Sequence, residues 1–256
     1  MNLLKLVVIN VGLSGGMRGL VFPDRSFVFF PIPAVGWNCR RLPTYAELRV
    51  RDYTRSKYAN LWEFRNASLS DLIPELARMR AHNDPDFKFR TYGHVKRGYG
   101  YEPLLESLQQ GDILLFLATL DYRSIDKSLR NPQVNPEWGG YIVGAFEIER
   151  WFTQEGFEHA PDEDQARFRS NPHFYCKSPA DLWIAGKEDT LGLFKKAVPL
   201  SSPIESQHCL PLLSENFRTW SGKRAGMGGW HRHAVTCKKH ASRVWNEIRT
   251  QGDSDD

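Results

Sequence analysis

The sequence has few cysteines and no cysteine motif. Its four cysteines occur singly, and the absence of a CxxC pair argues against both a zinc ribbon and a disulfide framework. We therefore expect four reduced thiols, at Cys39, Cys176, Cys209 and Cys237. Reduced thiols are typical of cytoplasmic proteins, and a cytoplasmic location is the corresponding expectation.

The sequence also lacks a long apolar run. No stretch approaches the roughly 20 apolar residues that a membrane-spanning helix needs, and we expect no membrane association. The N-terminal run at residues 4–11 is short, ends in glycine-rich sequence and has no small-residue cleavage pattern, so it does not resemble a signal peptide. Its β-branched residues favour a buried strand.

Three short enzyme signatures are missing: a serine nucleophile elbow, a dinucleotide-binding fingerprint and an HExxH zinc motif. A strong charge bias is missing too, since the formal net charge is +4. This mildly basic balance suits a phosphate-bearing ligand, but it is weaker than that of a protein dedicated to coating nucleic acid. Hydrophobic residues at 41% and charged residues at 25% are typical of a globular chain.

The apolar segments predict an α+β fold. Irregularly spaced strands with helices between them fit this class better than a regular βαβ alternation. We expect strands at residues 4–11, 27–30, 113–120, 141–148, 181–185 and 191–198. We expect helices at residues 44–48, 72–81, 101–109, 161–169 and 233–249, the second of them capped by Ser70 or Asp71.

The strands at 113–120 and 141–148 are predicted to pair as antiparallel neighbours. Their pattern resembles the PUA-like barrels of ASCH and EVE domains, which implies a mostly antiparallel curled sheet or small barrel with surrounding helices. Residues 1–205 are expected to form this domain. Residues 206–256 are expected to form a basic loop and a C-terminal helix packed on it.

A glycine-rich loop after the first strand is the first candidate binding segment. Glycine lets a backbone approach a ligand and present N–H groups to phosphate, and Arg18, Asp24 and Ser26 lie in or just after the loop. A hairpin turn at Pro23-Asp24 explains the same residues without a ligand and is the favoured interpretation.

The segment His82-Asn83-Asp84-Pro85-Asp86 is the second candidate. A histidine near two carboxylates can bind a divalent metal or transfer protons. The alternative is a helix end followed by an Asp-Pro turn.

The third candidate is Asn171-Pro172-His173, where His173 serves as a base or ligand or, alternatively, as a structural loop residue. A C-terminal set of His233, Cys237 and His240 has metal-ligand spacing on a helix. Apolar residues on nearly the same face favour a core role for it.

The order of these segments resembles the nucleotide modification associated domain family of type 3. The features that carry the resemblance run from a strand and Gly-rich loop through FPD-x-S, PIP, PTYAEL, HxDPD, a GD-led apolar strand and YIVG to NxH. They cover about residues 5–200. The resemblance implies a role around modified nucleotides or nucleic acids, in phage–host conflict or related bacterial systems. It implies no established reaction and no agreed catalytic residues, and the sequence identifies neither a cofactor nor a metal.

Together these observations predict one polar site in which His82 or His173 transfers protons and Asp84 and Asp86 orient a substrate or hold a metal. The residues expected to bind substrate are Arg18, Asp24, Ser26, Tyr92, Arg123, Asn171 and Lys187. Two alternatives remain. One is a non-catalytic reader of modified bases, with a pocket walled by Trp62, Tyr92, Tyr122 and Trp183; the other is a structural subunit without a nucleotide ligand.

Overall fold

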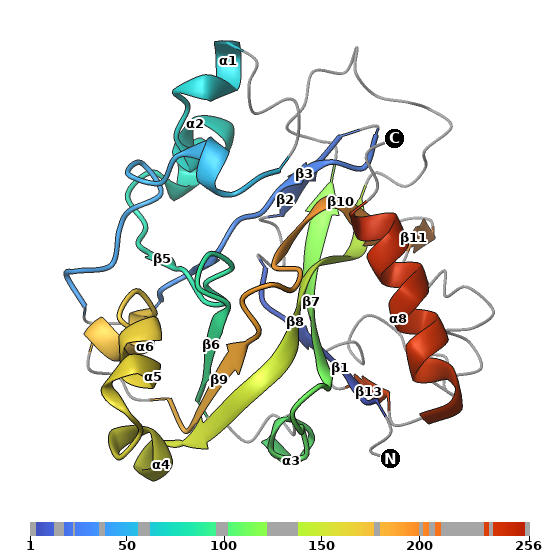
Figure 1. Cartoon of the computed structure of the whole chain (residues 1–256). Coiled ribbons are helices and arrows are strands. Elements are labelled where there is room, and N and C mark those ends of the chain that lie inside the picture. Colours follow the sequence, from blue (N-terminus) through green and yellow to red (C-terminus); the bar gives the residue numbers. More distant parts are fainter. Residues whose placement is uncertain are drawn as a thin grey trace.

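The chain folds around one mixed sheet, as the computed structural model in Figure 1 shows. The structure describes residues 4–12, 18–22, 24–35, 39–55, 62–95, 102–121, 138–176, 180–199, 202–204, 208–210, 233–235 and 238–253. Among them, nine strands join the main sheet, with a path of β13–β1–β7–β8–β9–β6. The strand β10 pairs with β8, and β2 pairs with β7 and β3. The expected α+β class is therefore confirmed.

The strands of the main sheet have the following bounds: β1 (Leu6–Asn10), β2 (Gly19–Val21), β3 (Phe27–Val28), β6 (Thr91–His94), β7 (Ile113–Asp121), β8 (Trp138–Thr153), β9 (Leu182–Gly186), β10 (Leu193–Pro199) and β13 (His233–Val235). Two separate pairs are β4 (Ile32–Pro33) with β5 (Ala81–His82), and β11 (Ser202–Ile204) with β12 (His208–Leu210). Only β1 and β2 pair in parallel with β7, so the sheet is mostly antiparallel, as predicted.

The helices are short, except for the last one. They are α1 (Trp62–Arg65), α2 (Leu69–Leu72), α3 (Glu102–Glu106), α4 (Gln154–Glu158), α5 (Asp162–Arg167), α6 (Pro172–Tyr175) and α8 (Lys238–Gly252), with 3₁₀ turns η1 (Val50–Asp52) and η3 (Pro74–Leu76). Figure 1 shows α8 along β10 on one side and α4–α6 beside β9 on the other. No helix in the described part of the chain is both long and apolar enough to cross a lipid bilayer.

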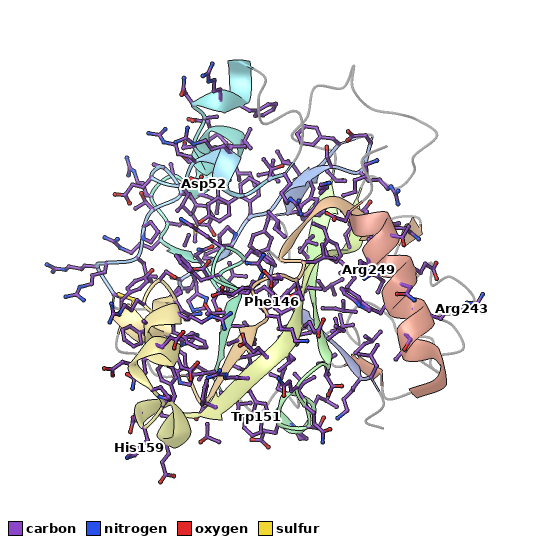
Figure 2. All side chains as sticks on the ribbon, viewed as in Figure 1. Asp52, Phe146, Trp151, His159, Arg243 and Arg249 are labelled. Atoms are coloured by element: carbon purple, nitrogen blue, oxygen red, sulfur yellow. A yellow bond between two sulfur atoms is a disulfide. The ribbon has the colours of Figure 1, made fainter. Side chains whose placement is uncertain are left out.

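The core lies on β7 and β8. These strands pair over their central residues as predicted, and their continuous apolar runs are buried. Phe116 and Phe146 pack edge-to-face with ring centroids 4.5 Å apart, and Phe146 lies in the interior of the molecule (Figure 2). Phe87 packs edge-to-face on Phe116, with ring centroids 5.3 Å apart. It also lies against β8 at Gly144, where an added Cβ would be 2.5 Å from the Phe87 ring.

The predicted helix at 72–81 is wrong. The segment forms only α2, the turn η3 and then strand β5. The residue before a proline avoids the αR region, and Ile73, before Pro74, has φ −135° and ψ 86°, which ends α2. Ser68 is the N-cap of α2, and it forms a capping box with Asp71. The predicted caps, Ser70 and Asp71, lie within the helix.

Two other predicted helices also differ from the structure. Residues 45–47 form a turn in place of the expected helix at 44–48, with Thr44 donating from N and Oγ1 to Glu47. The C-terminal helix begins at Lys238, and strand β13 precedes it. Its buried face, which includes Ala241 and Val244, packs on the core, and the boundary at residue 205 stays a prediction.

The expected barrel is not seen among the described strands. One antiparallel bridge between Ser26 and Lys196 brings the β2–β3 hairpin beside β10, and Ala197 N donates to Arg25 O. An isolated bridge is less than a strand pairing, so no closed or curled sheet is found in the described part of the chain.

A disulfide joins Cys39 to Cys176, with Cα atoms 5.5 Å apart. The expectation of four reduced thiols is therefore wrong. The two cysteines are 137 residues apart in the sequence, and only the fold brings them together. Cys176 caps the C-terminal end of α6. The cytoplasmic location, which was inferred from reduced thiols, stays a prediction.

Candidate functional site

Three buried polar side chains from distant segments converge at one place. His82 ends β5, Asp84 follows two residues later, and His173 lies in α6. Their candidate ligand atoms all lie within 4.8 Å of one another. His173 Nε2 is 3.6 Å from Asp84 Oδ2, and the rings of His82 and His173 meet edge-to-face with centroids 5.0 Å apart. We refer to these three residues as the His–Asp–His cluster.

Local sequence explains how α6 presents His173. Asn171 caps the helix by accepting from His173 N over 3.0 Å, and Pro172 occupies the first helical position, where a missing N–H costs nothing. His82 is held by the pairing of β5 with β4, where it lies opposite Ile32. The Asp84–Pro85 peptide bond is cis.

Asp84 is fixed by neutral donors. Gly93 N donates to both carboxylate oxygens at 3.1 Å, and Asn171 Nδ2 donates to Oδ1 over 2.9 Å. Burial disfavours the charged form and raises the pKa of Asp84 well above its usual range, and Asp86 raises it further, while the hydrogen bonds from Gly93 and Asn171 oppose the rise. A buried carboxyl group with a perturbed pKa beside two imidazoles is a frequent arrangement at functional sites.

The cluster lines a cavity of about 270 Å³. Its walls come from β1, β4 and β6 and include Asn10, Ile32, Tyr92 and His94. Tyr92 Oη and His94 Nδ1 lie 3.0 Å apart. The predicted substrate-binding residue Tyr92 is therefore in the same cavity as His82, Asp84 and His173.

Asn10 and His94 line this cavity but were not predicted. The spacing of Tyr92 and His94 was the available signal for His94, because side chains two apart on a strand share a face. No local signal identifies Asn10, since its place follows from the parallel pairing of β1 with β7.

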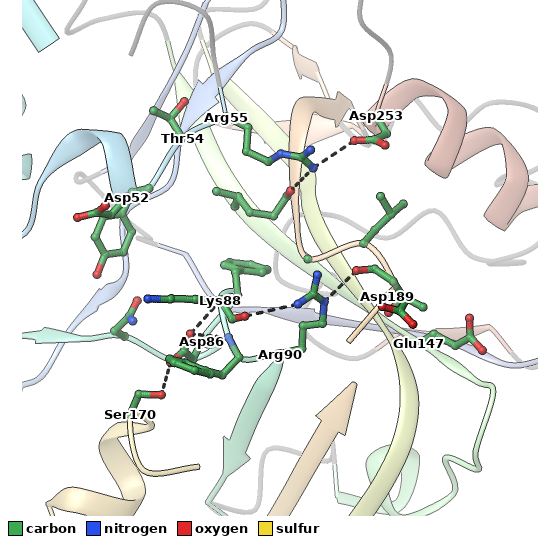
Figure 3. A pocket seen from close by; sticks show the side chains of 18 of the residues that line it. Asp52, Thr54, Arg55, Asp86, Lys88, Arg90, Glu147, Ser170, Asp189 and Asp253 are labelled. Carbon is green, nitrogen blue, oxygen red and sulfur yellow. Dashed lines mark hydrogen bonds and ion pairs between the residues drawn. The ribbon is translucent and has the colours of Figure 1, made fainter. Parts of the chain in front are cut away.

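Asp86 is predicted to be catalytic, and in the structure its carboxylate accepts hydrogen bonds from its own loop and from Ser170. Its Oδ1 accepts from Lys88 N at 3.0 Å and Phe89 N at 3.2 Å, and its Oδ2 accepts from Ser170 Oγ at 2.6 Å. It lines a different hollow, a groove of about 1110 Å³ that Figure 3 shows. Five Arg or Lys and five Asp or Glu side chains line that groove, so their charges balance and give no preference for a phosphate backbone.

The structure does not place Asp24 or Ser26 in the lining of the His–Asp–His cavity. Asp24 Oδ1 accepts from Ser26 N at 3.1 Å and from Ser26 Oγ at 2.6 Å, which is the local bonding of a turn. The turn interpretation of this segment therefore accounts for both side chains. Arg18 lies directly before β2 and is likewise outside the cavity lining.

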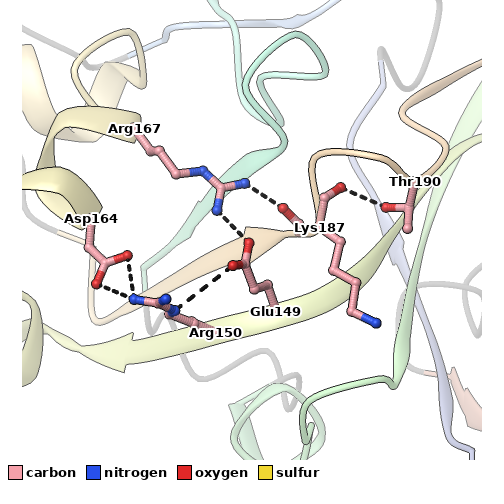
Figure 4. A network of polar contacts seen from close by, with 7 residues as sticks. Glu149, Arg150, Asp164, Arg167, Lys187 and Thr190 are labelled. Carbon is pink, nitrogen blue, oxygen red and sulfur yellow. Dashed lines mark hydrogen bonds and ion pairs between the residues drawn. The ribbon is translucent and has the colours of Figure 1, made fainter.

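Lys187 follows β9 and forms an ion pair with Glu147. A neighbouring network joins Arg167 to Glu149 at 2.7 Å and Arg150 to Asp164 at 2.7 Å (Figure 4). The two pairs that involve Arg150 and Arg167 hold α5 against β8, and Lys187 is not part of the cavity. Arg123 lies outside the described residues.

A third hollow, of about 320 Å³, is also lined by His173 and is aromatic. Trp183 is buried there, stacked on Phe157 with centroids 4.2 Å apart, and its Nε1 donates to Gln154 over 2.8 Å. Trp183 is therefore a packed side chain and not an open wall for a base. The side chain of Trp62 and all of Tyr122 lie outside the described part of the chain.

The fold and the cluster together define an α+β protein with a buried polar site in a small cavity. The model of a family described as nucleotide modification associated domain 3 matches residues 5–250, and the chain belongs to this family. The match extends past residue 200, where the sequence resemblance ended, and takes in most of α8. The chain matches no curated protein and no solved structure.

Proposed function

We propose that this protein acts in the modification of nucleotides or nucleic-acid bases, and that its chemistry takes place at the His–Asp–His cluster. The family to which the chain belongs supports the association with nucleotide modification. A role in phage–host conflict, which the family resemblance implies, belongs to this proposal.

The observation that carries the proposal is the burial of three titratable side chains at a cavity. His82, Asp84 and His173 are 7%, 3% and 3% exposed. Burying a carboxylate costs several kcal/mol by order of magnitude, and the hydrogen bonds from Gly93 and Asn171 offset only part of that cost at Asp84. A cluster kept at that cost on a cavity wall is more consistent with chemistry than with packing.

The size of the cavity favours a small planar ligand. A volume of about 270 Å³ falls just below the range of roughly 300–1,000 Å³ typical of drug-sized ligands. A single nucleobase suits such a space, with Tyr92 as the aromatic surface and His94 as a polar group. Because a base inside a duplex cannot reach a buried site, the substrate is a free nucleotide or a base taken out of the stack.

In this proposal His82 and His173 exchange protons with the substrate, and Asp84 orients His173 from 3.6 Å. Asn171 is a positioning residue, because it contacts Asp84 and the His173 backbone. Asp86 supports the loop that carries Asp84.

A non-catalytic reader of modified bases is the second candidate function. The same cavity favours it, since Tyr92 and the polar groups around it suit recognition of a base edge. A reader binds modified DNA or RNA with salt-sensitive affinity and leaves the ligand unchanged.

Nucleotide titrations with mass analysis of the mixture test the proposal. Wild-type protein is titrated with nucleotides and single-stranded oligonucleotides that carry normal or modified bases, and each mixture is then digested to nucleosides and weighed. We expect the wild type to bind a nucleotide and to change the nucleoside mass. His173→Gln should reduce both the affinity and the amount of changed nucleoside at least tenfold. Binding without a mass change supports the reader. Equal binding by wild type and His173→Gln contradicts both functions at this cavity.

A further inference from the structure

We infer that His82, Asp84 and His173 form a binding site for one divalent transition-metal ion of the Zn(II) or Fe(II) class. Two imidazoles and one carboxylate are a ligand set that proteins use for zinc and for non-haem iron, with the remaining coordination positions open. The set differs from that of magnesium or calcium, which prefer oxygen ligands throughout.

The distances fit a shared ion. Metal–nitrogen and metal–oxygen bonds are about 2.0–2.2 Å, so two ligand atoms on one tetrahedral ion lie roughly 3.3–3.5 Å apart. His173 Nε2 and Asp84 Oδ2 are already 3.6 Å apart. The candidate ligand atoms all lie within 4.8 Å of one another, so closing around one ion requires side-chain movements on the order of 1 Å.

The groups behind Asp84 are those a metal-binding carboxylate needs. Gly93 N and Asn171 Nδ2 donate to Asp84 and orient its carboxylate. Such outer contacts fix ligand direction and commonly change metal affinity by about 10–100-fold when removed. Their hydrogen bonds to Asp84 leave acceptor capacity, since a carboxylate has about four lone-pair positions.

The cavity supplies the open side of the site. All three cluster residues line it, together with Tyr92 and His94. An ion held by the cluster would face this space, where water or a base could complete its coordination. The carboxylate and imidazole ligands come from three places in the chain, β5, the following loop and α6, so the site depends on the folded state.

This inference concerns the cavity of the proposed function and rests on that proposal only for its biological use. With an ion bound, the two imidazoles are ligands, and water on the ion would transfer protons in their place. The test therefore measures metal uptake without nucleotide, so that the two ideas fail separately. Failure to take up metal would leave proton transfer at the cluster untouched. Failure to act on any nucleotide would leave the metal site standing.

The experiment uses the full chain without a histidine tag. The protein is stripped with a chelator, reloaded without oxygen with Zn(II), Co(II) or Fe(II) alone, desalted and analysed for bound metal. We expect one ion per wild-type chain and a rise in melting temperature on loading. His82→Gln, Asp84→Asn and His173→Gln should each lower affinity at least tenfold and remove that rise.

Two histidine substitutions serve as controls. His94→Gln changes the same cavity outside the cluster, and His159→Gln changes an exposed histidine at the periphery (Figure 2). Both should retain one ion per chain. X-ray absorption of the zinc-loaded wild type should show two imidazole ligands, a result that does not depend on whether any variant folds.

The inference is overturned if folded, stripped wild-type protein takes up less than a tenth of an ion per chain. It is also overturned if the cluster variants hold as much metal as the wild type, or if the absorption spectrum shows no imidazole ligand. Metal retained in the cluster variants would belong elsewhere in the chain.

Discussion

The Asn171 side chain donates from Nδ2 to Asp84 Oδ1 over 2.9 Å, and its own Oδ1 accepts from the His173 N–H over 3.0 Å. One amide thus connects the carboxylate and the helix that carries one of the imidazoles, although the two segments are 87 residues apart in sequence. The geometry of the candidate site depends on this side chain.

Asn171→Asp should lower the metal or ligand affinity of the site strongly and the free energy of unfolding less. The new carboxylate can still cap α6, but it cannot donate to Asp84 and places a second acceptor against it. Asn171→Ala loses both contacts and should lower the free energy of unfolding by about 2–3 kcal/mol, since a buried carboxyl group loses a donor and α6 loses its cap. Urea denaturation and metal or ligand affinity check the two variants, and wild-type affinity in Asn171→Asp would contradict this role.

Gly93→Ala should displace His173. A Cβ at position 93 would lie 2.6 Å from His173 Cδ2 and 3.2 Å from Ala180 Cβ, which is too close for either to stay in place. We expect at least a tenfold loss of ligand or metal affinity. Gly156→Ala is the matched control, because that glycine is exposed in α4 and its nearest contact is 3.3 Å away. An unchanged affinity in Gly93→Ala would show that His173 is not held as described.

Asp84→Asn should change the pH dependence of stability in chelator-treated protein. The pKa of Asp84 is raised in the folded state by burial. The folded protein then binds more protons than the unfolded chain, so stability falls as pH rises above the ordinary Asp value of about 3.9 and towards the raised pKa. The variant lacks this fall. Its stability relative to that of the wild type should therefore rise with pH across that window.

Thermal unfolding measured at several pH values checks this prediction. Asp162→Asn, an exposed carboxylate in the first turn of α5, controls for the loss of one charge. A stability difference between Asp84→Asn and wild type that stays constant with pH would contradict a carboxyl group penalised by burial.

Cys39→Ser should lower the free energy of unfolding by about 2–5 kcal/mol, as removal of a long-range disulfide usually does. The disulfide ties α6, which carries His173, to the segment that follows β4. Residues of β4 line the cavity. Non-reducing digestion and mass spectrometry should find the Cys39 and Cys176 peptides joined. Alkylation of both cysteines without a reductant would contradict the bond.

Much of the central sheet could be predicted from sequence because its signal is local. The runs that become β7 and β8 are continuously apolar, and a strand buried on both faces requires that pattern. The approximate positions of His82, Asp84 and His173 in one site followed from the order of the family segments. Their burial and distances required the fold.

Other features depend on contacts that no local pattern encodes. The Cys39–Cys176 bond joins residues that share no motif. Asn10 reaches the cavity only because β1 lies in parallel beside β7. The helix predicted at 72–81 does not form, because Ile73 leaves the helical conformation before Pro74. The apolar spacing of the segment favours a helix and does not reveal this break.

Our central proposal is that the His–Asp–His cluster carries out base modification. Its most direct test compares the nucleoside composition of DNA, RNA and the free nucleotide pool from bacteria expressing either wild-type protein or Asp84→Asn at equal levels. We expect a nucleoside mass that changes in abundance with the wild type and stays at the level of the empty-vector strain with Asp84→Asn. The same change with both proteins would contradict it, as would no change with either.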